Sequence, residues 1–181
     1  MKYTDTILNE IEQVIRQLKD EDVVALTEGI RRSKKIFVAG LGRSGLMIKS
    51  FAMRLMHIGF DVYVVGETVT PGIEQGDILI IGSGSGETSS LVSMASKAKS
   101  IGAKIALVTT NKQSGIAKIA DTGIELKAQS KEDASDVSTI QPMGSLFEQS
   151  LLILFDAVIL ELMDVMRKNG NTMFKRHANL E

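Results

Sequence analysis

The sequence predicts a doubly wound α/β fold, in which a mainly five-stranded parallel sheet is flanked by helices. Short apolar runs rich in isoleucine and valine alternate with longer segments of helical periodicity. The apolar runs are continuous, as expected of strands that are buried on both faces of a parallel sheet. Two of the runs end in glycine and serine just before a predicted helix, where open parallel sheets bind their ligands.

The order of the elements follows from the spacing of apolar residues. An N-terminal pair of helices is expected at 5–18 and 20–33, because apolar residues recur there at intervals of three and four. After residue 34 the period changes, and the predicted strands are 35–40, 61–65, 77–82, 104–109 and 123–126. Helices between strands are expected at 44–59, 88–101 and 114–120. Right-handed crossovers place the loops after Gly40 and Gly82 at one edge of the sheet.

A long helix is predicted from Pro142 to about Lys168, with Gly170 as its stop, and a polar surface loop at 129–140 precedes it. The helix is apolar almost all round, so we expect burial on most of its faces. Its acidic residues exclude a membrane span. In a chain of 181 residues, such a helix indicates burial against a sister subunit as well as the sheet. A homo-oligomer is therefore predicted.

The composition limits the classes of partner. The length fits a single domain over residues 1–181, and a formal net charge of −1 gives no reason to expect nucleic acid or an anionic membrane. The absence of cysteine excludes disulfides and thiolate metal sites. The polar amphipathic N-terminus has no apolar signal core, so a cytoplasmic protein is expected.

The segment 83–90 predicts an anion-binding site. It follows the apolar strand end Ile80-Ile81-Gly82 and opens a helix, and it consists mainly of glycine, serine and threonine. Glycines let backbone N–H groups approach a ligand, hydroxyls add donors, and a helix N-terminus adds partial positive charge. The loop contains no lysine or arginine, which suits a phosphate monoester of a small metabolite. The alternative is a solvated turn between two core elements.

A second glycine-rich segment, Gly40-Leu41-Gly42-Arg43-Ser44-Gly45, satisfies the dinucleotide fingerprint G-x-G-x-x-G. Glu67 lies roughly 20 residues further on, where such a site has its ribose-binding carboxylate. Against this interpretation, Arg43 and Ser44 suit a terminal phosphate or a sugar. The loop at 83–90 also already supplies a phosphate site. The two loops together favour a phosphosugar pocket, and dinucleotide binding remains the weaker alternative.

The paired loops resemble those of the sugar isomerase (SIS) domain family, whose fold is flavodoxin-like. The segments 139–149 and 173–181 extend the resemblance over essentially the whole chain and make it closest to the 6-phospho-3-hexuloisomerases of that family. The resemblance implies interconversion of D-arabino-hex-3-ulose 6-phosphate and D-fructose 6-phosphate through a cis-enediol, a step of the ribulose monophosphate pathway of formaldehyde fixation. It also implies a homotetramer that uses no cofactor and no metal.

The resemblance also suggests roles for residues that bind a phosphorylated ketohexose. Ser83, Ser85 and Thr88 match phosphate-binding hydroxyls of the family, helped by the backbone around Gly84 to Glu87, and Ser44 matches a residue that contacts the substrate. The complete set of expected substrate-binding residues is Gly42, Arg43, Ser44, Ser83, Gly84, Ser85, Gly86 and Thr88.

Two residues are expected to be catalytic. Glu148 stands among Leu146, Phe147 and Leu151, and a carboxylate in apolar surroundings takes up a proton readily, which suits a general base. The alternative is a glutamate that bridges subunits or faces solvent. His177 is assigned proton shuttling or hydroxyl positioning, within its own chain or across a subunit boundary. The alternative is a solvated tail histidine.

The remaining charged residues are expected to be structural or peripheral. His57 should cap the end of the helix 44–59, and Glu87 should stabilise the first turn of the next helix. Arg54 is a peripheral candidate for substrate binding. Glu67 either reaches the mouth of the pocket or is an ordinary loop carboxylate. His57 and His177 are far apart in the sequence and lack the spacing of metal ligands. A non-catalytic phosphosugar-binding regulator with an SIS domain is the functional alternative.

Overall fold

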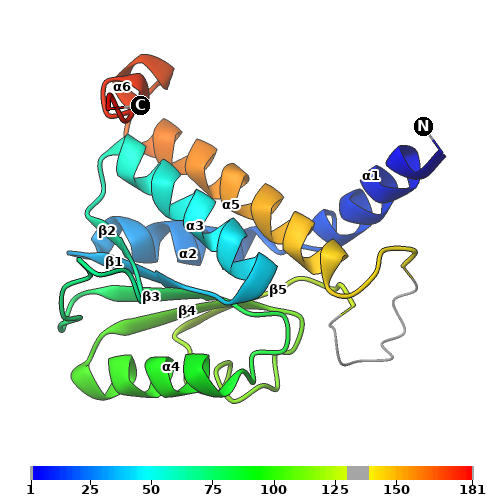
Figure 1. Ribbon diagram of the computed structural model, residues 1–181, viewed down its shortest axis with the longest axis horizontal. Helices are drawn as coiled ribbons and strands as arrows, with labels where there is room; N and C mark the ends of the chain where they lie inside the picture. The colour runs from blue at the N-terminus through cyan, green and yellow to red at the C-terminus, as the bar shows by residue number, and fades with distance from the viewer. Residues whose placement is uncertain (1, 130–138, 181) are drawn as a thin grey trace.

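Five parallel strands form the centre of the computed structural model, which describes residues 2–129 and 139–180 (Figure 1). The strands lie in the order β2-β1-β3-β4-β5, and every neighbouring pair is parallel. Their bounds are β1 Ile36–Ala39, β2 Val62–Val64, β3 Ile78–Gly82, β4 Lys104–Thr109 and β5 Thr122–Glu125. The predicted doubly wound fold with a five-stranded parallel sheet is confirmed.

Helices cover both faces of the sheet (Figure 1). One face carries α2, α3 and α5, and α1 packs against α5 and projects beyond the sheet. The other face carries α4. The short α6 packs against the end of α3, on the side of the sheet away from α4. The bounds are α1 Lys2–Ile15, α2 Asp20–Arg32, α3 Gly42–Ile58, α4 Ser89–Ile101, α5 Ser145–Val165 and α6 Gly170–Phe174. The N-terminal helical pair and the long C-terminal helix are therefore confirmed.

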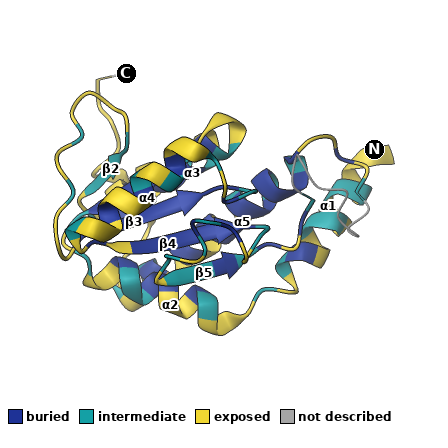
Figure 2. Ribbon diagram, turned by 90° about the horizontal axis from the view of Figure 1, so that it is seen from below, coloured by how far each residue is buried: buried dark blue, intermediate teal, exposed yellow. Residues whose placement is uncertain are grey.

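Strand side chains alternate between two apolar cores. On β1, Ile36 and Val38 belong to the cluster shared with α2, α3 and α5, whereas Phe37 and Ala39 belong to the cluster beneath α4. This division follows from the two-residue period of a strand. Because both faces are covered, β1 and β3 are buried throughout, and Figure 2 shows the central strands as the buried middle of the molecule.

The strand order places a ligand-binding crevice between β1 and β3. From β1 the chain moves through α3 to β2 on one side, and from β3 it moves through α4 to β4 on the other. At such a reversal the two helices lie on opposite faces, so the loops that enter them separate at the carboxyl ends of the strands. The two glycine-rich loops of the sequence meet at this point.

The helix expected at 114–120 is wrong, because residues 111–120 form a series of turns. Two backbone donors of this segment serve a neighbouring loop: Gly115 N–H donates to Glu87 Oε1 at 2.6 Å, and Ile116 N–H donates to the Gly86 carbonyl at 3.3 Å. Ser114 Oγ accepts from Ala117 N–H within the segment. These bonds fix the segment to the loop before α4.

The long helix is shorter than its predicted range of 142–168. It begins at Ser145, because Met143 has a positive φ of 61°, and it ends at Val165, with Arg167 at a φ of 54°. Gly170 opens α6 rather than stopping α5, since Asn169 and Thr172 form a capping box there. Most of the loop expected at 129–140 lies outside the described residues. Within residues 2–129 and 139–180, no helix has the length and apolarity to cross a membrane.

Candidate active site

Three helices begin around one cavity of about 210 Å³. They are α3, α4 and α5, and their N-cap residues Leu41, Thr88 and Gly144, all in the described part of the chain, form no side-chain cap. The first N–H groups of a helix have no partner within the helix and carry partial positive charge. The cavity is lined by Leu41, Gly42, Ser44, Gly82, Ser83, Gly84, Ser85, Thr88, Leu91, Gly144, Phe147 and Glu148. Its walls therefore favour an anion.

The loop after β3 forms one wall of this cavity. Ser83 Oγ accepts a hydrogen bond from Gly86 N–H at 3.2 Å, and Ser85 Oγ accepts one from Glu87 N–H at 3.3 Å. A hydroxyl that accepts in this way keeps its own hydrogen to donate to a ligand. Gly86 does not line the cavity: its φ is +64°, and a Cβ there would overlap Ser114 Oγ. Gly86 is thus a turn residue that shapes the wall from behind.

The glycines of the loop after β1 have a packing role. A Cβ at Gly45 would lie 2.7 Å from the Gly40 carbonyl oxygen, so glycine is needed for α3 to start this close to β1. Gly42 has a φ of +57° in the turn itself. The supposed ribose carboxylate, Glu67, forms an ion pair with Lys49 at 2.7 Å, and both side chains are about half exposed. The close approach of α3 to β1 and the turn at Gly42 therefore account for the glycines of the G-x-G-x-x-G segment without a bound dinucleotide.

Glu148 is the buried acid of the cavity, with a residue exposure of 2%. It lies in the first turn of α5, one helical turn after Gly144. Its Oε2 accepts a hydrogen bond from Arg43 Nη1 at 2.9 Å, and the same Nη1 donates to Ser145 Oγ at 3.0 Å. Arg43 comes from the first turn of α3, so this ion pair joins two of the three helix starts. The surroundings of Glu148 are thus less apolar than its sequence neighbours suggest.

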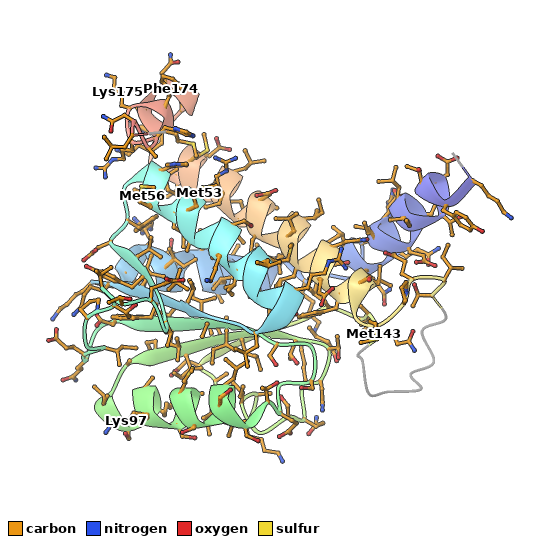
Figure 3. All side chains as sticks on the ribbon, in the orientation of Figure 1. Met53, Met56, Lys97, Met143, Phe174 and Lys175 are labelled. Atoms are coloured by element: carbon orange, nitrogen blue, oxygen red, sulfur yellow. The ribbon has the colours of Figure 1, made fainter. Side chains whose placement is uncertain are left out.

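His177 lies at the other end of α3. Its ring stacks on that of His57 with centroids 5.6 Å apart, so the fold brings together two histidines that are distant in the sequence. The 17 residues of α3 span roughly 25 Å from the cavity to this pair. Figure 3 shows the separation: Met53, Met56 and Phe174 cluster at this end, whereas Met143 lies near the start of α5. His177 therefore does not reach the cavity of its own chain.

The other charged candidates lie outside the cavity lining. Arg54 Nη1 lies 3.4 Å from His57 Nδ1, at the same remote end of α3. Glu87 precedes the first turn of α4, and its carboxylate binds Gly115 N–H, so it holds a loop rather than stabilising a helix start. His57 is buried in the last turn of α3, where burial, followed by the nearby charges of Arg54 and His177, lowers its pKa.

Seven of the ten predicted site residues line the cavity: Gly42, Ser44, Ser83, Gly84, Ser85, Thr88 and Glu148. Arg43 contacts it through Glu148. Sequence reasoning missed five lining residues: Leu41, Gly82, Leu91, Gly144 and Phe147. The available signal was their position, because Gly144 and Phe147 lie within one turn of Glu148 and the other three lie in or beside the two glycine-rich loops.

The comparisons with known proteins agree with this geometry. Residues 29–153 match the family model described as the SIS domain. The 3-hexulose-6-phosphate isomerase of Bacillus subtilis (strain 168) is 50% identical, over 99% of this chain and 98% of its own length. The 3-hexulose-6-phosphate isomerase of Mycobacterium gastri is 42% identical, over 97% of this chain and 88% of its own.

A solved structure shows the same fold over the full length. The crystal structure of a protein from Methanococcus jannaschii, inferred to have the molecular function of 3-hexulose-6-phosphate isomerase, matches with a TM-score of 0.87. It is 37% identical, and each chain covers 100% of the other. The resemblance expected from the paired loops is thus confirmed. The chain belongs to the SIS domain family.

Proposed function

We propose that the protein is an isomerase that interconverts D-arabino-hex-3-ulose 6-phosphate and D-fructose 6-phosphate in the ribulose monophosphate pathway. The observation that carries the proposal is the cavity in which a buried carboxylate, Glu148, faces an anion site made by three helix starts. The names of the Bacillus and Mycobacterium relatives support the choice of substrate. The proposed enzyme is cytoplasmic.

The phosphate is held by the loop after β3. Ser83, Ser85 and Thr88 line the cavity beside the start of α4, and their hydroxyls and the backbone N–H groups supply donors for phosphate oxygens. The lining contains no lysine or arginine side chain among the residues that the structure describes there. Neutral hydrogen-bond donors and helix N-termini suit a phosphate monoester, which can be bound without a metal ion. Gly42 and Ser44 on the opposite wall then bind the sugar.

Glu148 is the proposed general base. Moving the ketone from C3 to C2 requires removal of the C2 hydrogen as a proton, which gives a cis-enediol, and return of a proton to C3. The carboxylate takes the proton from C2 and the resulting carboxylic acid returns it to C3, while the O3 carbonyl oxygen gains a proton and the O2 hydroxyl loses one. Arg43 fixes Oε2 at 2.9 Å and so orients the carboxylate toward the sugar.

The active form is proposed to be a homo-oligomer, and specifically a tetramer. α1 projects beyond the sheet, and Leu8 on it is 59% exposed (Figure 1). Large apolar side chains are also exposed on α3 and α5, among them Leu46 and Leu160. In such an assembly, His177 of one chain would serve the cavity of a neighbour as a proton shuttle. This arrangement reconciles a catalytic His177 with its distance from its own cavity.

The test is turnover by the purified chain. Hexulose 6-phosphate is generated from formaldehyde and ribulose 5-phosphate by the partner synthase, and fructose 6-phosphate is followed. Glu148→Gln should lower kcat by a factor of about 10² to 10⁴, because the base is lost while the side chain keeps its shape. The matched control is Asp156→Asn, an exposed acid on the same helix, which should leave kcat unchanged.

Ligand binding separates the alternatives. In the proposed enzyme, fructose 6-phosphate still raises the melting temperature of Glu148→Gln. Wild-type protein that is stabilised by fructose 6-phosphate but shows no turnover would be a phosphosugar sensor. Stabilisation by NAD with micromolar affinity would instead restore the dinucleotide interpretation. Full activity of Glu148→Gln would remove Glu148 from the mechanism.

A further inference from the structure

The carbonyl of Gly84 is the most heavily hydrogen-bonded acceptor of the phosphate loop. It accepts from Thr109 Oγ1, from Thr110 Oγ1 and from Thr110 N–H, each at 2.9 Å. Thr109 is the last residue of the buried strand β4 and Thr110 follows it, and neither lines the cavity among the described residues. Three donors on one carbonyl oxygen exceed the two lone pairs that define its usual capacity. The orientation of this peptide is therefore strongly fixed.

The direction of that carbonyl decides what the cavity presents to an anion. The Gly84 carbonyl and the Ser85 N–H belong to one planar trans peptide, in which C=O and N–H point in opposite directions. Because the oxygen is held toward Thr109 and Thr110, the Ser85 N–H points away from them, on the side where Gly84 and Ser85 line the cavity. A reversed peptide would place a carbonyl oxygen there and repel phosphate.

The same neighbouring segment also binds the carbonyl of Gly86 and the side chain of Glu87. The Gly86 carbonyl accepts from Ile116 N–H at 3.3 Å, and the Glu87 carboxylate accepts from Gly115 N–H at 2.6 Å. The chain from Thr109 to Ile116 thus supports the phosphate loop along its outer side. Removal of Thr110 Oγ1 leaves the Thr110 N–H in place as a donor to the Gly84 carbonyl.

We propose that Thr109 and Thr110 are positioning residues for phosphate binding, which act by holding the Gly84–Ser85 peptide with its N–H toward the ligand. The proposal rests on the phosphosugar site of the proposed function and adds residues from outside the cavity. Loss of the Thr110 hydroxyl should weaken binding of any phosphate monoester, whereas the proton transfer at Glu148 should be unaffected.

The experiment compares Thr110→Val, which keeps the shape and loses the hydroxyl, with Thr110→Ser, which keeps the hydroxyl. Thr110→Val should raise KM for hexulose 6-phosphate and the inhibition constant of inorganic phosphate by roughly 3- to 10-fold, with kcat within about twofold of wild type. Thr110→Ser should restore both constants. The double variant Thr109→Val/Thr110→Val should show a larger loss of phosphate binding.

A control hydroxyl is available at Thr122, which begins β5 and pairs with Ala106 of β4, away from the carboxyl ends of the strands where the cavity lies. Thr122→Val should leave KM and phosphate binding unchanged at a similar melting temperature. An unchanged inhibition constant for phosphate in both valine variants, or a loss confined to kcat, would overturn the positioning role. Binding of inorganic phosphate is also read by thermal shift without any turnover, so a failure of the isomerase assay is distinguished from a failure of this inference.

Discussion

The ring of His57 lies in the last turn of α3 with only 4% of the residue exposed. The groups that face it are Arg54 from its own helix, at 3.4 Å from Nδ1, and His177 from the chain end, whose ring stacks on it. Burial lowers the pKa of His57 most, and the positive charges of Arg54 and His177 lower it further. This position therefore favours the neutral imidazole of His57 over its charged form.

The stability of the protein should therefore depend on pH through His57. Its pKa is lower in the folded chain than the ordinary value of about 6.5 in the unfolded chain, so below that value the unfolded state binds more protons. The contribution of neutral His57 is fully present above about pH 6.5 and is lost as the pH falls through the folded pKa. Urea midpoints between pH 8 and pH 5 measure this loss.

His57→Gln provides the comparison for that measurement. The difference between wild type and variant in the free energy of unfolding should shrink as the pH falls from 7.5 to about 5.5. Parallel curves over this range would show that the histidine does not couple folding to protonation. The C-terminal segment should loosen first, because the ring of His177 stacks on His57 and on Phe174 at this end.

At the scale of elements, the packing of α3 on α5 sets the width of the cavity. Both helices begin at the cavity, one with Ser44 in its first turn and the other with Glu148. Further along, Phe51 and Phe155 stack with ring centroids 4.1 Å apart and an interplanar angle of 7°. Both rings are among the fully buried side chains. The aromatic pair therefore fixes the distance between the two helices.

Phe155→Ala should lower the free energy of unfolding by about 3–5 kcal/mol, because it removes a buried ring and leaves a cavity against Phe51. Phe155→Leu should cost less, since it fills part of the space. The measurement is urea unfolding followed by circular dichroism. A cost below about 1 kcal/mol for the alanine variant would show that the helices close over the gap. In the surviving folded protein, kcat should fall with the altered position of Glu148.

The element scale also shows what the sequence could and could not predict. Continuous apolar runs predicted β1, β3 and β4, because these strands are buried on both faces of the sheet. The edge strands β2 and β5 are less buried and were predicted from shorter runs between turn residues. The segment 114–120 was mistaken for a helix, since its apolar spacing does not reveal that Gly115 and Ile116 donate to another loop. The ends of α5 were misplaced because the positive φ angles of Met143 and Arg167 have no signature in the residue type.

The candidate site was predicted to a similar extent. Glycines and hydroxyls after a strand have a local chemical meaning, so Ser44, Ser83, Ser85 and Thr88 were found. The partnership of Arg43 with Glu148 and the stacking of His57 on His177 depend on tertiary contacts between distant segments. Neither contact leaves a pattern in one sequence.

At the scale of the whole molecule, the exposed apolar side chains of α3 and α5 form part of a surface that suits a second copy. Leu46 and Met53 on α3 are 61% and 45% exposed, and Ile153 and Leu160 on α5 are 45% and 62% exposed. In each helix the two residues are seven positions apart and so share one side. Repeated apolar exposure of this kind on a globular chain indicates an interaction surface.

Met53→Glu/Leu160→Glu should therefore yield a smaller species than wild type in sedimentation velocity, because two charges would be buried in the subunit contact. Val69→Glu is the control: Val69 is 85% exposed on the loop after β2, and its replacement should leave the mass unchanged. An unaltered mass for the double variant would place the subunit contact elsewhere. If His177 serves a neighbouring cavity, the smaller species should also lose activity.

The proposed anion site would be built mainly from main-chain groups at three helix starts, and this has a consequence for how the protein tolerates mutation. A ligand held by side chains is lost when one of them is replaced. A ligand held by peptide N–H groups survives most such replacements and depends instead on the path of the chain. Constraint should thus concentrate at Gly45, Gly86 and the two threonines behind the loop, while exposed Ser89 and Ser90 remain free to vary.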